Sequence, residues 1–217
     1  MPARRSLLRL IPLALFAVFA AGCASRAPRA AAEYVPPRLD LARYSTLGIV
    51  EFGGRGAKGL GEPATREFMA AIHAAQPGTP LLELGSFAKA FPGASREALD
   101  PEAVRSLAAR AHVDVIVLGE VVEEKASPRI SINPEYGTAS ASAKLTTSLT
   151  VRILDGASGA TVWSASSRRN ISLAGIDLTT LGVRKVGATP AEEARALLIR
   201  DLVSDVTSDL RPRWVQR

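Results

Sequence analysis

Between residues 46 and 122, short apolar runs alternate with amphipathic helical segments, and this alternation limits the possible folds more than any other feature of the chain. By length and composition, three of the segments are predicted to be buried strands: residues 46–52, 81–84 and 113–122. The segments between them, residues 63–75 and 101–111, each place apolar side chains on one helical face. Because strands joined through helices pair in parallel by right-handed crossovers, this part predicts a parallel sheet.

Residue types typical of helix starts mark where the helices begin. Pro63 suits the first turn of the first helix, and Asp100 can cap the second helix, with Pro101 at its first position. A capping box at residues 189–192 predicts a third helix, whose apolar stripe runs to Leu210. The chain therefore has three predicted helices.

From residue 145 onward, apolar and polar residues alternate. Residues 145–153 predict a strand with one buried and one wet face, and a turn at residues 155–159 joins it to residues 160–169, its hairpin partner. The order β-α-β-α-β-β-β-α predicts an α/β (mixed α+β) fold. We expect a single three-layer-like domain, with a mixed sheet of about five strands and helices packed on the sheet.

Two stretches beside the hairpin do not fit this pattern. Residues 124–140 and 171–188 lack a clean helical period and contain Gly, Pro, Asn and Ser. They are interpreted as long loops. Because loops of this length in a compact domain are often functional, they are also the predicted binding segments, together with the hairpin.

The amino terminus has the layout of a bacterial export signal. A basic start is followed by an apolar run that is too short to span a membrane. The sequence Ala20-Ala21-Gly22-Cys23 resembles the lipobox of lipoprotein signals, in which Leu is more usual at the position of Ala20. The resemblance implies that Cys23 becomes the lipid-bearing (palmitate-carrying) first residue of the mature protein. The alternative is an ordinary secretory leader with a chance cysteine.

This interpretation divides the chain into three parts. Residues 1–22 are the predicted signal peptide, residues 23–37 the lipidated cysteine with a flexible tether rich in Ala, Arg and Pro, and residues 38–217 a single periplasmic α/β domain. The mature chain has 195 residues and a side-chain charge of +3, compared with +6 for the full sequence. This mild basic bias suits anionic lipid headgroups or cell-wall polymer. No nucleic-acid partner is expected, because the protein is predicted to be exported.

Cys23 is the only cysteine. Once it is acylated, disulfides, a cysteine metal site and a thiol nucleophile are all excluded, even in a compartment that permits disulfides. The domain must therefore be stabilised by burial of apolar side chains, and the chain is long enough for one core of ordinary size.

Three segments resemble the CsgG-like lipoproteins, the family of the curli-secretion channel subunit. They are residues 47–52 with the following glycines and helix, residues 111–121, and the hairpin of residues 149–164 with Val162-Trp163. Two relatives are the lipoprotein that activates a penicillin-binding protein and the amino-terminal domain of the Tol-system translocation protein. The resemblance, over residues 44–210, implies a periplasm-facing assembly or regulatory domain that is not an enzyme. The long hairpins of the channel are predicted neither in residues 124–140 nor in residues 171–188, where the apolar residues come nearer to the pattern but are irregularly spaced. The smaller relatives are therefore the closer model.

Residues 54–59 spell GxGxxG between a predicted strand and a predicted helix, with Glu83 at the end of the next strand. Such a loop can bring backbone amides close to a pyrophosphate. Here the helix does not start at the third glycine, because Gly61 and Pro63 intervene. A flexible loop is therefore preferred to nucleotide binding.

No catalytic, cofactor-binding or metal-binding residue is predicted. His73 and His112 have no Cys, His or paired acid at ligand spacing. The hairpin serines have no GxSxG elbow and no nearby base: Ser164, Ser166 and Ser167. The tail at residues 211–217 places cations around Trp214, and it is interpreted as a frayed terminus, with contact to an anionic interface as the alternative.

Taken together, these features predict a lipoprotein anchored by Cys23 in the outer membrane, on its periplasmic face. Outer-membrane sorting rests on Ala24, since Asp at this position is the usual inner-membrane retention signal. The domain would bind an envelope protein, or itself, as an accessory to envelope assembly or maintenance. The alternatives are an oligomeric subunit of a curli-type secretion channel and a periplasmic ligand-binding domain that uses the glycine-rich loop.

Overall fold

The computed structural model describes residues 32–56, 59–124, 127–133, 135, 138–179, 182–186 and 191–216. The predicted signal peptide and Cys23 lie outside these residues. The chain separates into a large unit, residues 36–212, and a small ribbon at residues 32–35 and 213–216, and the two are described separately. Within the described ranges, no helix has the length and apolar character needed to cross a membrane.

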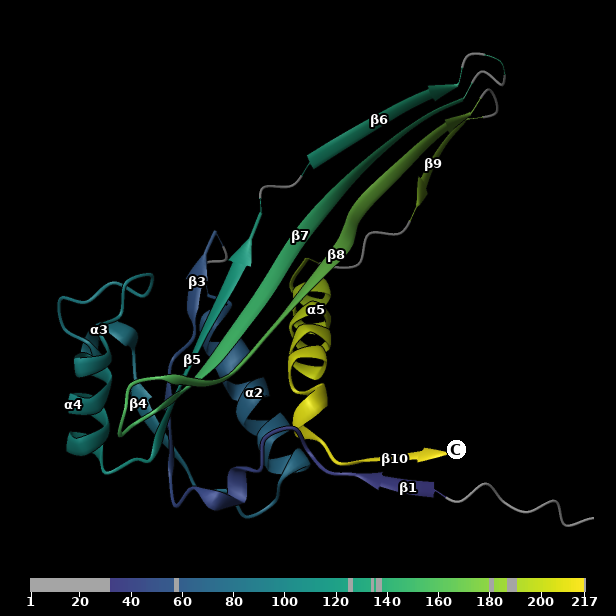
Figure 1. Ribbon diagram of the computed structural model, residues 1–217. Coiled ribbons are helices and arrows are strands. Elements are labelled where there is room, and N and C mark those ends of the chain that lie inside the picture. The colour runs from purple at the N-terminus through teal and green to yellow at the C-terminus, as the bar shows by residue number, and fades with distance from the viewer. Residues whose placement is uncertain are drawn as a thin grey trace, which may run out of the picture. The chain divides into compact units, whose positions relative to one another are not determined.

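The large unit contains an eight-stranded mixed sheet (Figure 1). Its main path runs β4-β2-β5-β7-β8-β9, with β3 paired to β5 and β6 paired to β7. The strands are β2 (Leu47–Val50), β3 (Gly53–Arg55), β4 (Leu81–Gly85), β5 (Val115–Glu123), β6 (Ser127–Asn133), β7 (Thr138–Asp155), β8 (Thr161–Thr179) and β9 (Gly182–Val186). The β2–β4, β2–β5 and β3–β5 pairings are parallel, and the β5–β7, β6–β7, β7–β8 and β8–β9 pairings are antiparallel. The predicted mixed α/β sheet is confirmed, with eight strands in place of about five.

Helices cover both faces of the sheet. On one face, α2 (Gly61–Ala75) and α5 (Ala191–Val206) form one core with the buried side chains of β2, β5 and β7. On the other face, α3 (Phe87–Ala90) and α4 (Pro101–Ala111) form a second, smaller core. Two short 3-10 helices, η2 (Leu41–Arg43) and η3 (Ser208–Leu210), complete the unit. The predicted three-layer arrangement is thus present.

Helix α4 begins and ends as its sequence dictates. The Asp100 carboxylate accepts a hydrogen bond from the Glu102 amide at 2.9 Å, and Pro101 occupies the first helical position. After the helix, His112 adopts a left-handed conformation with φ of 54°. The cap predicted at Asp100 is confirmed, and His112 is explained as a helix terminator.

The prediction of long loops at residues 124–140 and 171–188 is wrong. Strand β6 and the start of β7 occupy most of residues 124–140, and the end of β8 and β9 occupy most of residues 171–188. The strand pattern is hard to recognise because the start of β7 alternates only Ser with Ala, and because the apolar residues of 171–188 are irregularly spaced. Pro128 is compatible with a strand because β6 pairs only with β7 among the described residues, and proline is tolerated on edge strands.

The ribbon consists of β1 (Ala32–Val35) and β10 (Arg213–Gln216), paired antiparallel. The prediction of a frayed tail is therefore wrong, and the predicted tether ends in a strand. Tyr34 lies opposite Trp214, with ring centroids 5.2 Å apart in an edge-to-face contact. The partners are nearly the whole chain apart, so neither segment indicates the pairing by itself.

Candidate functional site

One face of the β7–β8 hairpin is polar and lies opposite α2 and α5. Residues 145, 147, 149, 151 and 153 of β7 are buried toward those helices, so the residues between them point to the other side. The strand register places residues of β8 and β5 beside these outward-pointing residues of β7, on the same face of the sheet. We define the polar face as Glu120, Thr146, Ser148, Thr150, Arg152, Ser164, Ser166, Arg168 and Asn170.

Helices α3 and α4 cover only one end of this side of the sheet. Their core reaches Ile116 and Leu118 of β5 and Leu154 of β7, and it stops there. Beyond it, Thr150, Ser166 and the other β8 members of the polar face are exposed. An exposed sheet face made of hydroxyl and charged groups needs no helix to cover it, so it is available to a partner.

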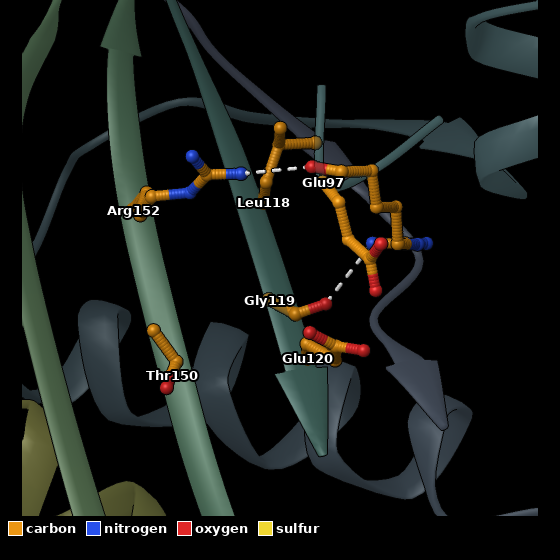
Figure 2. A pocket seen from close by; sticks show the side chains of 7 residues that line it. Glu97, Leu118, Gly119, Glu120, Thr150 and Arg152 are labelled. Atoms are coloured by element: carbon orange, nitrogen blue, oxygen red, sulfur yellow. Dashed lines mark hydrogen bonds between the residues drawn. The ribbon is translucent and has the colours of Figure 1, made fainter. Parts of the chain in front are cut away.

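A pocket of about 390 Å³ lies where the polar face meets the α3–α4 layer. It is lined by Arg96, Glu97, Leu118, Gly119, Glu120, Thr150 and Arg152. Figure 2 shows Thr150 and Arg152 on β7 beside the pocket residues of β5, with Glu97 on the opposite wall. The pocket therefore joins three segments that are distant in sequence.

Arg96 holds one wall of the pocket in place. Its guanidinium donates to the carbonyl oxygens of Glu51 at 2.8 Å and Gly119 at 3.1 Å, and it lies 4.3 Å from the centre of the Phe87 ring. Burial lowers the pKa of Arg96 from its ordinary value, against the opposing effect of nearby Glu120 and Glu51. These contacts give Arg96 a mainly structural role.

Gly53 makes room for the Arg96 guanidinium. A Cβ at Gly53 would lie 2.9 Å from Arg96 Nε. At Gly119, a Cβ would lie 2.4 Å from the Phe52 ring, so this strand position also requires glycine. Close packing explains both glycines.

The pocket contains charges of both signs. Arg152 donates to the Arg96 carbonyl oxygen at 3.3 Å, and Arg55 lies 3.3 Å from Glu97 and 3.4 Å from Glu120. Such a lining suits backbone amides and mixed polar side chains better than an apolar small molecule. In the part of the chain that the structure describes, no group of three or more His, Cys, Asp or Glu is placed to hold a metal ion.

An ion pair crosses the polar face. Arg168 of β8 donates to both carboxylate oxygens of Glu124, at 2.6 and 2.7 Å. On the helix side of the same strand, Arg169 donates to both oxygens of Asp205 on α5, each at 2.7 Å. Ser167 Oγ also donates to Asp205, and these bonds hold the pKa of Asp205 below its usual value. Adjacent arginines thus tie β8 to Glu124, just after the end of β5, on one face of the sheet and to α5 on the other.

The outer edge of β8 is unpaired over a long stretch. Strand β7 occupies one edge of β8, whereas β9 begins to pair on the other only at Gly175. Residues 161–174 therefore have no outer strand partner among the described residues. Exposed strand edges of this kind present free N–H and C=O groups to another strand. Sequence reasoning located the hairpin but missed this edge.

The histidines and serines considered in the sequence are not brought together. His73 is exposed in the last turn of α2, and His112 ends α4. Ser164 and Ser166 lie on the polar face, whereas Ser167 points to the helix side and binds Asp205. Among the described residues, neither histidine thus lies on the polar face with Ser164 and Ser166.

The glycine-rich loop has a packing explanation. Its first part is strand β3, paired with β5, and residues 57–58 lie outside the described residues. A Cβ at Gly56 would lie 2.3 Å from the Glu123 carbonyl oxygen, and one at Gly61 would lie 2.1 Å from the Phe52 carbonyl oxygen. Both glycines allow the backbone to pass close to a neighbouring backbone segment. The alternative of nucleotide binding has no support from this geometry.

The sequence matches no protein-family model and no curated protein. Among solved structures, the PelC dodecamer from Paraburkholderia phytofirmans is 16% identical, with a TM-score of 0.46, covering 84% of this chain and 98% of that one. Lipoprotein GNA1162 from Neisseria meningitidis is 15% identical, with a TM-score of 0.35, covering 58% and 81%. The LpoB C-terminal domain from Salmonella enterica is 14% identical, with a TM-score of 0.35, covering 62% and 84%. Structural neighbours thus include bacterial lipoproteins, but likenesses this distant do not identify a function.

Proposed function

We propose that this chain is a lipid-anchored protein of the bacterial envelope, whose α/β domain binds another protein along the outer edge of β8 and the adjoining polar face. The unpaired edge at residues 161–174 carries the proposal. Anchoring rests on the lipobox-like sequence before Cys23, and outer-membrane sorting rests on Ala24. The domain acts as an accessory in envelope assembly or maintenance and not as an enzyme.

The length of the edge suits an added strand. Fourteen residues of extended chain span roughly 45 Å, whereas an ordinary strand of five or six residues needs roughly 17–20 Å. In strand addition, main-chain hydrogen bonds supply affinity and pockets beside the edge supply specificity. The polar face is continuous with this edge through Ser164, Ser166 and Arg168, so a bound segment contacts both.

The polar face contributes selectivity. Arg152 and Thr150 lie at the pocket, and Glu120 adds a carboxylate on the same wall. The donors and acceptors of the polar face can pair with a polar peptide. A purely apolar peptide would leave these groups without hydrogen-bond partners. The ligand class is therefore a polar protein segment.

Site-specific photocrosslinking in intact cells tests this function. A photoreactive residue at Ser166 lies on the polar face next to the edge, and one at His73 lies exposed on α2 as the matched control. We expect a discrete higher-mass adduct from position 166 and none from position 73. Equal adducts at both positions, or none at 166, would show that this face binds no partner.

Self-association through the same edge is the second candidate, as in a channel subunit. An unpaired edge is self-complementary, since two copies of one strand can pair antiparallel about a two-fold axis. The mass of the adduct from position 166 separates the two candidates: twice the chain mass indicates a second copy, and any other mass indicates a different protein. Sizing of the detergent-extracted protein then separates a two-fold dimer from a larger ring.

The anchor is tested independently of the partner. Cys23→Ser removes the sulfur that carries the lipid, so we expect loss of labelling by radioactive palmitate, and either an unprocessed precursor or a protein released in the soluble periplasmic fraction. Retained labelling would contradict anchoring at Cys23. Ala24→Asp is the sorting test, with the expected shift from outer-membrane to inner-membrane fractions.

A further inference from the structure

The ribbon of β1 and β10 is rich in exposed apolar side chains. Tyr34 is 50% exposed, Trp214 70% and Val215 46%, within eight residues of ribbon. The described residues of the large unit contribute only three large apolar side chains of comparable exposure: Leu82, Val162 and Leu197. The ribbon is thus the most apolar exposed element in the described part of the chain.

Pairing places the two aromatic rings on one side of the ribbon. Tyr34 and Trp214 are directly opposite in the antiparallel register, and their rings touch edge to face. Each ring carries a polar tip, the Tyr hydroxyl or the Trp N–H, on an apolar body. Such amphipathic rings concentrate at the level of lipid headgroups in membranes.

The positive charge of the mature chain is also concentrated here. Residues 36–212 contain twenty Lys and Arg and twenty Asp and Glu, so their side chains are neutral overall. Residues 24–35 and 213–217 contain four arginines against Glu33: Arg26, Arg29, Arg213 and Arg217. The entire excess of +3 therefore flanks or lies on the ribbon, where it complements an anionic surface.

The distance from Cys23 limits where the ribbon can go. Strand β1 begins nine residues after Cys23, a stretch that reaches at most about 30 Å when fully extended. If Cys23 carries lipid, as the proposed function requires, the ribbon cannot leave the neighbourhood of the bilayer surface. A basic patch near an acyl anchor supplies the second signal that stable membrane attachment requires.

We propose that the ribbon is a second membrane contact, with the rings of Tyr34 and Trp214 in the headgroup region of the leaflet that holds the anchor. The flanking arginines lie on lipid phosphates. A second copy of the ribbon is a poorer occupant of this surface, because it carries the same excess of positive charge. The inference rests on the anchoring part of the proposed function for its location, and it is independent of the protein partner.

Vesicle binding of the unlipidated mature chain, Cys23→Ser, tests the ribbon without the acyl group. The probes are vesicles of phosphatidylethanolamine and phosphatidylglycerol in a 3:1 ratio, with pure phosphatidylcholine vesicles for comparison. We expect flotation with the anionic vesicles, weakened by salt, and little with the neutral ones.

The matched variants are Tyr34→Ser with Trp214→Ser on the ribbon, and Leu197→Ser at a similarly exposed position of α5. We expect partitioning onto the anionic vesicles to fall by about tenfold or more in the ribbon variant. The α5 variant should partition as the parent chain does. Equal partitioning of both variants, or none by the parent chain, overturns the inference. Concentration-dependent dimers that the ribbon variant abolishes in the absence of vesicles also overturn it, in favour of self-association.

Tryptophan emission supplies a second measurement. The chain has two tryptophans, and Trp163 is 5% exposed, so Trp214 is the one that changes environment on binding. Addition of anionic vesicles should shift the emission to shorter wavelength in the parent and not in the ribbon variant. Palmitate labelling at Cys23 without vesicle binding would leave the anchor intact and reject the ribbon contact, so the two failures are distinguishable.

Discussion

The two faces of the β7–β8 hairpin belong to the same strands and have opposite roles. Toward α2 and α5, Leu149, Val151 and Ile153 are fully buried in the main core. Toward the other side, the intervening residues are Thr, Ser, Arg and Asn, with exposed members at Thr150 and Ser166. One face therefore holds the fold together, and the other can change without loss of the fold.

The period of a strand explains this division. Because successive side chains point to opposite faces, the buried set fixes the register, and a slip by one residue would expose every core side chain. The polar set is then presented in a defined order without contributing to the register. A binding surface built in this way is rigid and yet free to vary in sequence, as recognition of a specific partner requires.

The largest effect is expected on the buried face. Leu149→Ala removes a side chain with 0% exposure, so we expect a loss of about 2–5 kcal/mol in the free energy of unfolding. The matched control is its neighbour, Thr150→Ala, which should change that free energy by less than about 0.5 kcal/mol. Chemical denaturation of both variants measures the contrast. Similar losses in the two would mean that the faces are not distinct.

The next effect concerns the junction between the polar face and the α3–α4 layer. Arg96→Ala removes two hydrogen bonds to carbonyl oxygens and the contact with Phe87, so we expect a loss of about 1–3 kcal/mol. Arg66→Ala, which breaks only an exposed ion pair with Glu62, is the control and should cost less than about 0.5 kcal/mol. If Arg96→Ala is as mild as the control, Arg96 does not hold the pocket wall.

The same comparison explains what the sequence could predict. The alternation of residues 145–153 located the β7 core face, and Asp100 with Pro101 located the start of α4, because both are local patterns. Strands β6 and β9 escaped prediction because neither shows a clear alternation: β6 contains Pro128, and the only apolar side chains of β9, Val183 and Val186, are three residues apart in place of two. The ribbon escaped prediction because its two strands are separated in sequence by nearly the whole chain.

The pocket could not be predicted, since it joins three distant segments around Arg96, Gly119 and Arg152. Only Gly119 gave a signal, as a glycine within an apolar run marks a close approach. Nothing in the sequence around Arg96 indicates that its guanidinium reaches the carbonyl oxygens of Glu51 and Gly119. Tertiary packing alone creates this part of the site.

A smaller effect is expected from the ion pair between Arg169 and Asp205, whose contribution to stability depends on pH. The hydrogen bonds from Arg169 and Ser167 lower the pKa of Asp205 in the folded protein, so Asp205 stabilises the fold above its unfolded pKa of about 3.9. This contribution disappears as the pH falls through the lower, folded value. Asp205→Asn should therefore cost up to about 1 kcal/mol at pH 7 and progressively less in acid.

Glu124→Gln is the control for this prediction, because it breaks the corresponding ion pair on the polar face. The Arg168 and Glu124 side chains are 62% and 50% exposed, against 50% and 36% for Arg169 and Asp205. Unfolding curves at pH 7 and pH 3 measure both variants. A larger cost for Glu124→Gln at pH 7 would mean that the polar face contributes more to stability than we infer.

The smallest effect on stability is expected where the effect on binding is largest. Ser166→Arg places a long charged side chain on the polar face next to the β8 edge, where its neighbours are exposed and no core atom is displaced. We expect a change below about 0.5 kcal/mol in the free energy of unfolding, together with a clear loss of the crosslinked partner. The crosslinking residue for this test is placed at Asn170, which lies four residues further along β8 on the same face. A folded Ser166→Arg variant that still captures its partner in full would move the binding surface away from the polar face, and the functional contrast between the two faces of the hairpin would no longer hold.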